Sequence, residues 1–370
     1  MQISDPDHRG TWEGFQDLCT LLSPLARQRE VRWDAVNWDT VIKLASEHKV
    51  GPAVFRGIEG EASVPNAIKA YFHTLQNINS RRNLSIMDQL ASVLGQLNER
   101  GIVVAFLKGA ASLADSLYDD PAERFILDID LLIAPENARE CDVILRGMGY
   151  KDVAPVSRWA ARKHHLPGLL APSGEFCIEL HTSLSKLRLK RMISARAVFQ
   201  RASIAQWRGE PIYMLHPTDR IVHNIVHSQL HHKLSKRGMV ELRQLREFSL
   251  LAARYGQQID WSDVEQRFSA AGCGDVLADQ ATYSRALMAV SCPIKERDAD
   301  KAMHRLQTAV DTSIVNTPSW AKALGKLIGD NAIGFGRNPT VVINLINPFL
   351  WPKRFQRILA ILKHGQDQRI

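Results

Sequence analysis

Cysteines are few and scattered in this sequence, which argues against a disulfide-rich fold and against a fold held by a cysteine zinc site. Five cysteines occur in 370 residues, an odd number, and no two of them form a CxxC pair. This pattern indicates neither a disulfide framework nor a zinc site built from cysteine thiolates. A chain of this length can instead bury a sizeable apolar core, and the usual length prior predicts about two or three domains.

Long apolar runs are also absent. No stretch approaches the roughly 20 apolar residues that a membrane-spanning helix needs. The N-terminus, MQISDPDHRG, is polar where a secretory signal would be apolar. We therefore expect an untargeted cytoplasmic protein without a membrane partner. The sequence also contains no internal repeat and no low-complexity segment.

Signatures of nucleic-acid binding are missing, although the chain is basic. Its formal net charge is +8 and its pI is near 9.3, which fits a protein that meets nucleotides, phosphorylated substrates or nucleic acid. No glycine-arginine tract, RNA-binding aromatic motif or zinc finger singles out nucleic acid among these anions. Nucleic acid stays open as a partner but is not favoured.

Both ends of the chain have the periodicity of amphipathic helices, with apolar residues recurring at three and four positions. Helices are predicted over residues 11–26, 34–57, 65–100, 217–234, 238–256, 260–272 and 276–290. The apolar stretch 340–352 contains two prolines and fits a buried loop, a docking segment or a short helix. We expect one helical region over 1–100 and another over 216–370.

Strand-like runs lie between these regions. β-branched and apolar residues predict strands over 102–107 and 125–133, in the interval 150–180 and within 199–215. Short helices are expected over 110–118 and 135–149, and APSG at 171–174 is a hairpin turn signal. The alternation predicts an α+β fold with a small mixed sheet in residues 101–215.

The motif LDIDLLI places two carboxylates on one face of a strand. Asp128 and Asp130 point the same way because alternate side chains of a strand share a face. Two adjacent carboxylates repel each other unless a cation lies between them, and a divalent metal is such a cation. Glu179 repeats the pattern in CIELH and would join them if its strand lay beside the first. The competing interpretation is an edge strand with two solvated carboxylates.

The segment FLKGAASLADSLYDDPAERFILDIDLLI, together with CIELH, resembles the nucleotidyltransferase superfamily that includes DNA polymerase β. It is most similar to an uncharacterised bacterial nucleotidyltransferase family with a Lys-Gly, a Tyr-x-x-Pro-x-x-Arg and an Asp-Ile-Asp-Leu-Leu signature. The resemblance covers roughly residues 30–255 and is most specific over 103–133. The residues that carry it are Lys108, Gly109, Tyr118, Pro121, Arg124, Asp128, Ile129, Asp130, Leu131 and Leu132.

The resemblance implies an enzyme that transfers a nucleoside monophosphate from a nucleoside triphosphate (NTP) such as ATP to an acceptor hydroxyl and releases pyrophosphate. It implies that Asp128 and Asp130 are catalytic residues that bind Mg²⁺, with two ions in the site, and that Glu179 is the third catalytic carboxylate, which orients the acceptor hydroxyl or binds the catalytic metal. A glycine turn brings backbone amides close to phosphates, and Gly109 fills that place. The superfamily usually has Gly-Ser or Gly-Gly there, whereas Ala110 follows Gly109 in this chain.

Three side chains near the glycine turn are candidate contacts for the NTP phosphates. The nearest hydroxyl, Ser112, lies a helical step beyond the turn. Lys108 and Arg124 are suitable cations, and the planar guanidinium of Arg124 can bind a phosphate in bidentate fashion. For Lys108, the competing interpretation is a cation at the end of a strand that reaches solvent.

Histidines form a second set of candidates. His181 shares the strand face of Glu179 and is a candidate donor-site residue. His223, His227 and His231 recur at spacing four, which predicts a row along one helix face. Such a row can pack between domains, contact phosphate when protonated or bind zinc, and His227 is our candidate for nucleotide contact.

The acceptor is not specified by any motif. A small molecule, a peptide or an RNA is compatible with the nucleotidyl-transfer signature. Two alternatives also stay open, namely a catalytically inactive nucleotide-binding or scaffold protein with the same fold, and a toxin-like enzyme that modifies RNA or protein. The segment ELRQLREF at 241–248 fits an ion-paired helix face, with a binding role as the alternative.

Overall fold

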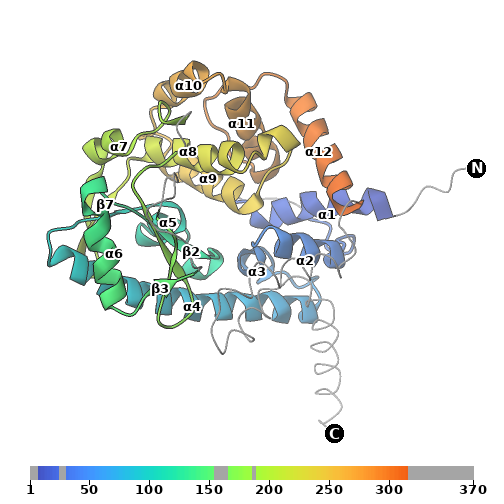
Figure 1. The fold of residues 1–370 in the computed structure, drawn as a ribbon. Coiled ribbons are helices and arrows are strands. Elements are labelled where there is room, and N and C mark those ends of the chain that lie inside the picture. The colour runs from blue at the N-terminus through green and yellow to red at the C-terminus, as the bar shows by residue number, and fades with distance from the viewer. Residues whose placement is uncertain (1–6, 25–30, 154–165, 186–188, 316–370) are drawn as a thin grey trace, which may run out of the picture.

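A seven-stranded mixed sheet lies between helices in the computed structural model, which describes residues 7–24, 31–153, 166–185 and 189–315. Figure 1 shows the long helix α4 along one side of the sheet and α8 and α9 on the other. The predicted α+β class with helical regions at both ends is confirmed. The stretch 340–352 lies outside the described residues.

The first hundred residues form four helices: α1 (Asp7–Leu22), α2 (Trp38–Glu47), α3 (Gly51–Ile58) and α4 (Asn66–Asn98). The single helix predicted over 34–57 is wrong, because the chain turns between α2 and α3. Lys49 has φ +56°, outside the helical region, and Pro52 stands in the first turn of α3. The long helix predicted over 65–100 is confirmed as α4.

The sheet has the strand order β3-β4-β5-β2-β1-β7-β6. Strand β2 is parallel to β5, β1 is parallel to β7, and the other neighbours are antiparallel. The strands are β1 (Ala105–Phe106), β2 (Asp128–Leu132), β3 (Lys151–Asp152), β4 (Leu169–Leu170), β5 (Cys177–His181), β6 (Ser203–Trp207) and β7 (Glu210–Met214). The helical elements between them are α5 (Lys108–Ala114), η2 (Pro121–Glu123), η3 (Pro135–Asn137), α6 (Ala138–Gly147) and α7 (Ala195–Arg201).

The C-terminal helices begin with α8 (Pro217–Ile225), which continues as a π-helical turn, η5 (Val226–His231). The continuous α-helix predicted over 217–234 is therefore wrong in its second half, where the wider π turn changes which side chains are neighbours. The remaining elements are η6 (Ser235–Arg237), α9 (Leu242–Tyr255), α10 (Trp261–Ala270), α11 (Gly274–Met288) and α12 (Ala299–Val315).

Alternation along β2 divides its side chains between two apolar clusters. Ile129 and Leu131 pack in the cluster that also contains Val93 and Leu97 of α4. Leu132 belongs to the cluster formed with α7, α8, α9, α10 and α11. Since Asp128 and Asp130 share the face of Leu132, both carboxylates lie on the side of the sheet that the C-terminal helices cover.

Buried polar side chains in the middle of α4 hold the loop that leads into β2. Asn79 donates hydrogen bonds to the carbonyls of Ala122 (2.6 Å) and Arg124 (3.1 Å). Asn83 donates to the carbonyls of Pro121 (2.7 Å) and Arg124 (2.9 Å). These bonds satisfy backbone carbonyls that would otherwise be buried without partners. Helix α4 thereby sets where β2 begins.

Within the described residues, none of the helices combines the length and the apolarity needed to cross a bilayer. The division of the chain at residues 100 and 215 stays a prediction. One apolar cluster joins α1, α2 and α3 to residues of α9, α11 and α12, so side chains from both terminal regions share a core.

Candidate functional site

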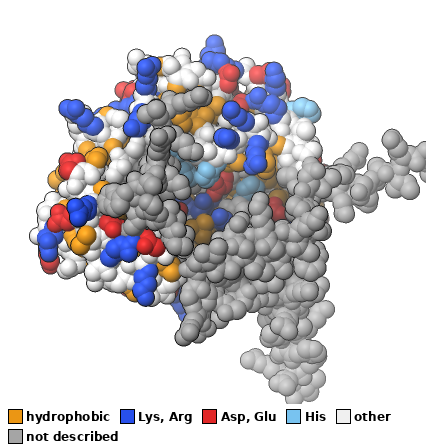
Figure 2. Space-filling model, in the orientation of Figure 1, with side chains coloured by type: hydrophobic (Ala, Val, Ile, Leu, Met, Phe, Trp, Pro, Cys, Tyr) orange, Lys and Arg blue, Asp and Glu red, His pale blue; other side chains and the backbone are white. Residues whose placement is uncertain are grey.

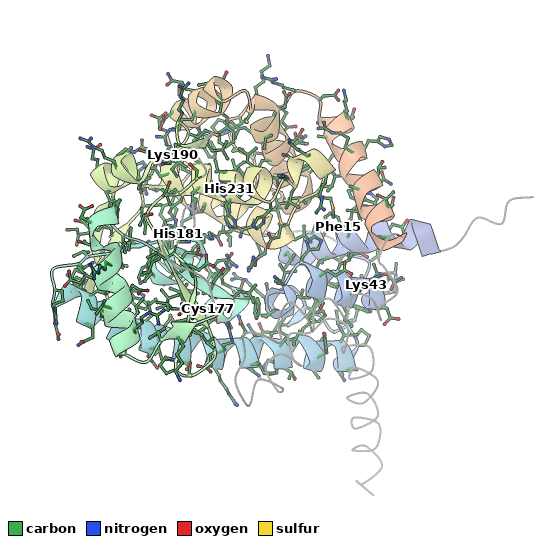
Figure 3. The ribbon with its side chains drawn as sticks, viewed as in Figure 1. Phe15, Lys43, Cys177, His181, Lys190 and His231 are labelled. Atoms are coloured by element: carbon green, nitrogen blue, oxygen red, sulfur yellow. The ribbon has the colours of Figure 1, made fainter. Side chains whose placement is uncertain are left out.

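The centre of the candidate site is the parallel pair β2 and β5. Their register places Asp130 opposite Glu179 and Asp128 opposite Cys177. The expected neighbourhood of the two strands is therefore confirmed. Figure 3 shows Cys177 and His181 at the two ends of β5, with His231 on the helical segment beyond the sheet.

Asp130 is 1% exposed and has two basic partners. Its Oδ1 atom lies 2.7 Å from Lys108 Nζ and 2.6 Å from His181 Nε2. Burial alone would raise the pKa of the Asp130 carboxyl, but the charge of Lys108 and the hydrogen bond from His181 lower it far below its ordinary value. Asp130 is therefore ionised.

Asp130, Glu179 and His181 bring potential ligand atoms for a divalent cation close together. One ligand atom from each of these residues lies within 4.8 Å of the others. Glu179 Oε2 is 3.6 Å from His181 Nε2. Two carboxylates and an imidazole fit a divalent cation. The imidazole also contacts Asp130, so it can act as a ligand or orient the carboxylate from outside the metal shell.

Asp128 lies on the same face but has a different environment. It is half-buried and lines the pocket beside β2. Burial and the nearby charge of Asp130 raise the pKa of its carboxyl, and Lys108 offsets this only in part. Among the described residues, no cation forms an ion pair with Asp128. The charge of this carboxylate is therefore only partly compensated, and a bound divalent cation would supply the rest.

The pocket beside these carboxylates has a volume of about 170 Å³. Figure 2 shows acidic, basic and histidine side chains gathered in the hollow at the centre of this face. The pocket is lined by Lys49, Lys108, Gly109, Arg124, Ile126, Leu127, Asp128, Asp130, His227, His232, Arg243 and Gln244. Its walls thus come from the N-terminal helices, the sheet and the C-terminal helices.

The glycine turn lies where the sequence predicts it, at the start of α5 and against the pocket. A β-carbon on Gly109 would approach the guanidinium of Arg124 to 3.4 Å. The same β-carbon would lie 3.3 Å from Cγ1 of Ile126, which is a tight contact, so the Ile126 side chain would have to shift. Gly109 therefore keeps this wall of the pocket open and packed on Arg124.

Arg124 and Ser112 are both buried, but only Arg124 lines the pocket. Arg124 is 3% exposed, pairs with Glu247 at 2.8 Å and donates to the carbonyl of Phe125 at 2.8 Å. Ser112 is fully buried, donates to the carbonyl of Lys108 and does not line the pocket.

The π turn rearranges the histidine row. The ring of His227 lies 6.3 Å from those of His223 and His231, but only 4.5 Å from that of His232. Burial and the charge of Lys108 lower the pKa of His223 to about 3 and that of His227 well below its ordinary value. Both imidazoles are therefore neutral near pH 7. The described histidines of this row do not come within 4.8 Å of two further ligand groups.

Sequence reasoning missed Lys49 and His232 as pocket residues. Lys49 lies in a turn that the periodicity assigned to a continuous helix, and His232 falls outside the spacing of four. Arg243 was expected on an ion-paired helix face, and it does pair with Glu241 at 2.7 Å. It also lines the pocket, which the sequence pattern alone does not distinguish.

The chain was compared with protein-family models, curated proteins and solved structures. A family model described as an uncharacterised nucleotidyltransferase matches residues 34–289. A search of curated proteins finds no match. Among solved structures, the antibiotic-resistance factor ANT(2'')-Ia is similar with a TM-score of 0.36 and 15% identity, over 50% of this chain and 91% of that chain.

The family match spans helices α2 to α4, the whole sheet and the C-terminal helices as far as α11, well over half of the chain. It includes the paired carboxylates of β2, their partner on β5 and every residue that lines the pocket. The chain therefore belongs to this uncharacterised nucleotidyltransferase family and is a nucleotidyltransferase.

Proposed function

We propose that this protein is a Mg²⁺-dependent enzyme that transfers a nucleoside monophosphate from an NTP to an acceptor hydroxyl and releases pyrophosphate. The observation that carries the proposal is the half-buried Asp128, which has no ion-pair partner among the described residues and lies on the same strand face as Asp130. Paired carboxylates in this state need a divalent cation between them.

We propose Asp128, Asp130 and Glu179 as the carboxylates that hold the ions. Their donor set fits this assignment, because hard divalent cations prefer carboxylate oxygens. When bound, the ions would neutralise phosphate charge and lower the pKa of the attacking hydroxyl. His181 orients Asp130 through the bond at its Oδ1 atom, and Lys108 holds the same oxygen from the other side.

The other residues of the site bind and position the donor. Gly109 leaves room for a phosphate to approach the backbone, and Arg124 lines the pocket beside it. His227 lines the pocket with a neutral imidazole, whose N–H can donate to a phosphate or ribose oxygen. The acceptor stays unassigned among small molecules, peptides and RNA.

The test is a thermal-shift panel with ATP, GTP, CTP and UTP, each with and without Mg²⁺. We expect the wild type to be stabilised by at least one nucleotide only when Mg²⁺ is present, because ligand binding to the native state raises its stability. Asp128→Asn should lose this stabilisation. It should keep or raise the melting temperature without nucleotide, because it removes a repelled carboxylate.

Asp34→Asn is the matched control, because Asp34 is an exposed aspartate outside the pocket. It should behave as the wild type does. No stabilisation of the wild type by any nucleotide would favour the inactive-scaffold alternative. Stabilisation that persists in Asp128→Asn would contradict the role given to this carboxylate.

A further inference from the structure

The pocket is lined by side chains of different exposure: Asp130 is buried, whereas Lys49 and Leu127 are exposed and Arg243 is partly exposed, so these three lie at the pocket mouth. Lys49 reaches it from the turn between α2 and α3, and Arg243 reaches it from α9. Half-buried Asp128 lines the same pocket as Lys49, and its charge acts to raise the pKa of the Lys49 ammonium. A ligand that fills the pocket from Asp130 outward therefore meets Lys49 and Arg243 at its outer end.

The backbone at Lys49 is held in a conformation that lysine disfavours. Its φ of +56° lies in the left-handed region, and Lys108, which also lines the pocket, has φ +48°. The position just past the end of a helix favours glycine for this reason. Backbone strain of this kind clusters at ligand-binding sites, although it also occurs away from the pocket in this chain, as at Lys233. Both lysines present their side chains to the same pocket.

The charges at the pocket mouth leave a positive surplus. Arg243 is bonded to Glu241 at 2.7 and 3.0 Å, whereas no described residue forms an ion pair with Lys49. Desolvation and the charge of Arg243 lower the pKa of the Lys49 ammonium, and Glu241 and Asp128 offset this in part. An anionic ligand that bridges the two cations would remove their mutual repulsion.

We propose that Lys49, together with Arg243, binds the β- and γ-phosphates of the NTP, so that the N-terminal helical region completes the donor site. The inference rests on the proposed function, which places the α-phosphate at the carboxylates of the sheet. The two outer phosphates then extend toward the pocket mouth, and they leave as pyrophosphate. Cations at this end stabilise the charge that the leaving group gains during transfer.

Lys49→Gly separates this role from a structural one. Glycine accepts the left-handed conformation without strain, so the variant should fold with an unchanged or higher melting temperature. Lys233→Gly is the matched control, because Lys233 is also a lysine with positive φ, +57°, but it is exposed and does not line the pocket.

Binding is measured by titration calorimetry with Mg²⁺ and three probes: ATP, inorganic tripolyphosphate and AMP. We expect Lys49→Gly to weaken ATP and tripolyphosphate binding about tenfold or more, in line with the loss of a charge-assisted contact. AMP binding should change less than about twofold, since AMP lacks the outer phosphates. Lys233→Gly should leave all three affinities unchanged.

The outcomes distinguish this inference from the proposed function. Equal losses for AMP and ATP, or unchanged tripolyphosphate affinity in Lys49→Gly, overturn the assignment of Lys49 to the outer phosphates. Wild-type protein that binds neither ATP nor tripolyphosphate in the presence of Mg²⁺ overturns the proposed function itself, and the inference with it.

Discussion

At the scale of single residues, the clearest lesson concerns arginine. The sequence pattern offers Arg124 as a phosphate ligand, because a planar guanidinium beside a metal motif suits that role. In the structure, this guanidinium is buried, bound to Glu247 on α9, and in contact with the turn at Gly109. This partner lies 123 residues away in the sequence, and no local pattern reveals it, although Arg124 also lines the pocket.

The buried ion pair between Arg124 and Glu247 leads to a prediction about stability. Glu247→Leu should lower the free energy of unfolding by about 3–5 kcal/mol, because it leaves a buried charge without its partner. Adding Arg124→Met should recover most of that loss, since a well-packed apolar pair often replaces a buried ion pair at little cost. Urea denaturation of both single variants and the double variant measures this coupling.

The same series tests the sequence-based role of Arg124. If Arg124→Met alone left the urea midpoint unchanged but weakened ATP binding, Arg124 would be a phosphate ligand and its bond to Glu247 incidental. We expect instead that Arg124→Met lowers the free energy of unfolding by more than it weakens the free energy of ATP binding.

At the scale of elements, the sequence predicts the strands and the long helices, but it does not predict where a helix is interrupted. The Asp-x-Asp strand, the hairpin before Glu179 and the helix over 65–100 all follow from periodicity and turn residues, and all are confirmed. The break at Lys49 and the π turn after Ile225 have no comparable signal. Both depend on tertiary packing, which brings α2 and α9 together and places the histidines beside the pocket.

His48 links α2 to α9 and predicts a pH dependence of stability. The backbone N–H of Leu242 donates to His48 Nδ1 at 3.3 Å, so the imidazole caps α9 from another helix. Burial lowers the pKa of His48 from its ordinary value of 6.5 to about 4, and nearby Glu241 offsets this only in part. Between pH 4 and pH 6.5, His48 therefore binds a proton more readily in the unfolded state than in the native state.

The stabilising contribution of neutral His48 is complete above pH 6.5 and is lost as the pH falls toward 4. His48→Asn retains an acceptor near the Nδ1 position without a titrating group. The free energy of unfolding should fall over this interval by about 1–3 kcal/mol more in the wild type than in the variant. Parallel pH profiles for the two proteins, measured by urea denaturation, would contradict this explanation.

At the scale of the whole molecule, the site belongs to three parts of the chain at once. Residues from the N-terminal helices, the sheet and the C-terminal helices line one pocket. The sheet wall can be predicted from the sequence, because the two carboxylates of the motif are only two residues apart on one strand. The helical walls are assembled by contacts between residues far apart in the sequence. Periodicity predicts which face of each helix is apolar, but not which helices come together.

This sharing predicts how the sheet region behaves alone. One face of the sheet packs on Val93 and Leu97 of α4, and the other face packs with Phe248 of α9. A fragment of residues 101–215 keeps the strands but exposes both faces to water, at a cost of about 25 cal/mol for each Å² of apolar surface. We expect it to lack the near-UV circular dichroism and the cooperative thermal transition of the full chain. A fragment that unfolds cooperatively would instead make 101–215 an independent domain, and the predicted boundaries at 100 and 215 would then be domain boundaries in the strict sense.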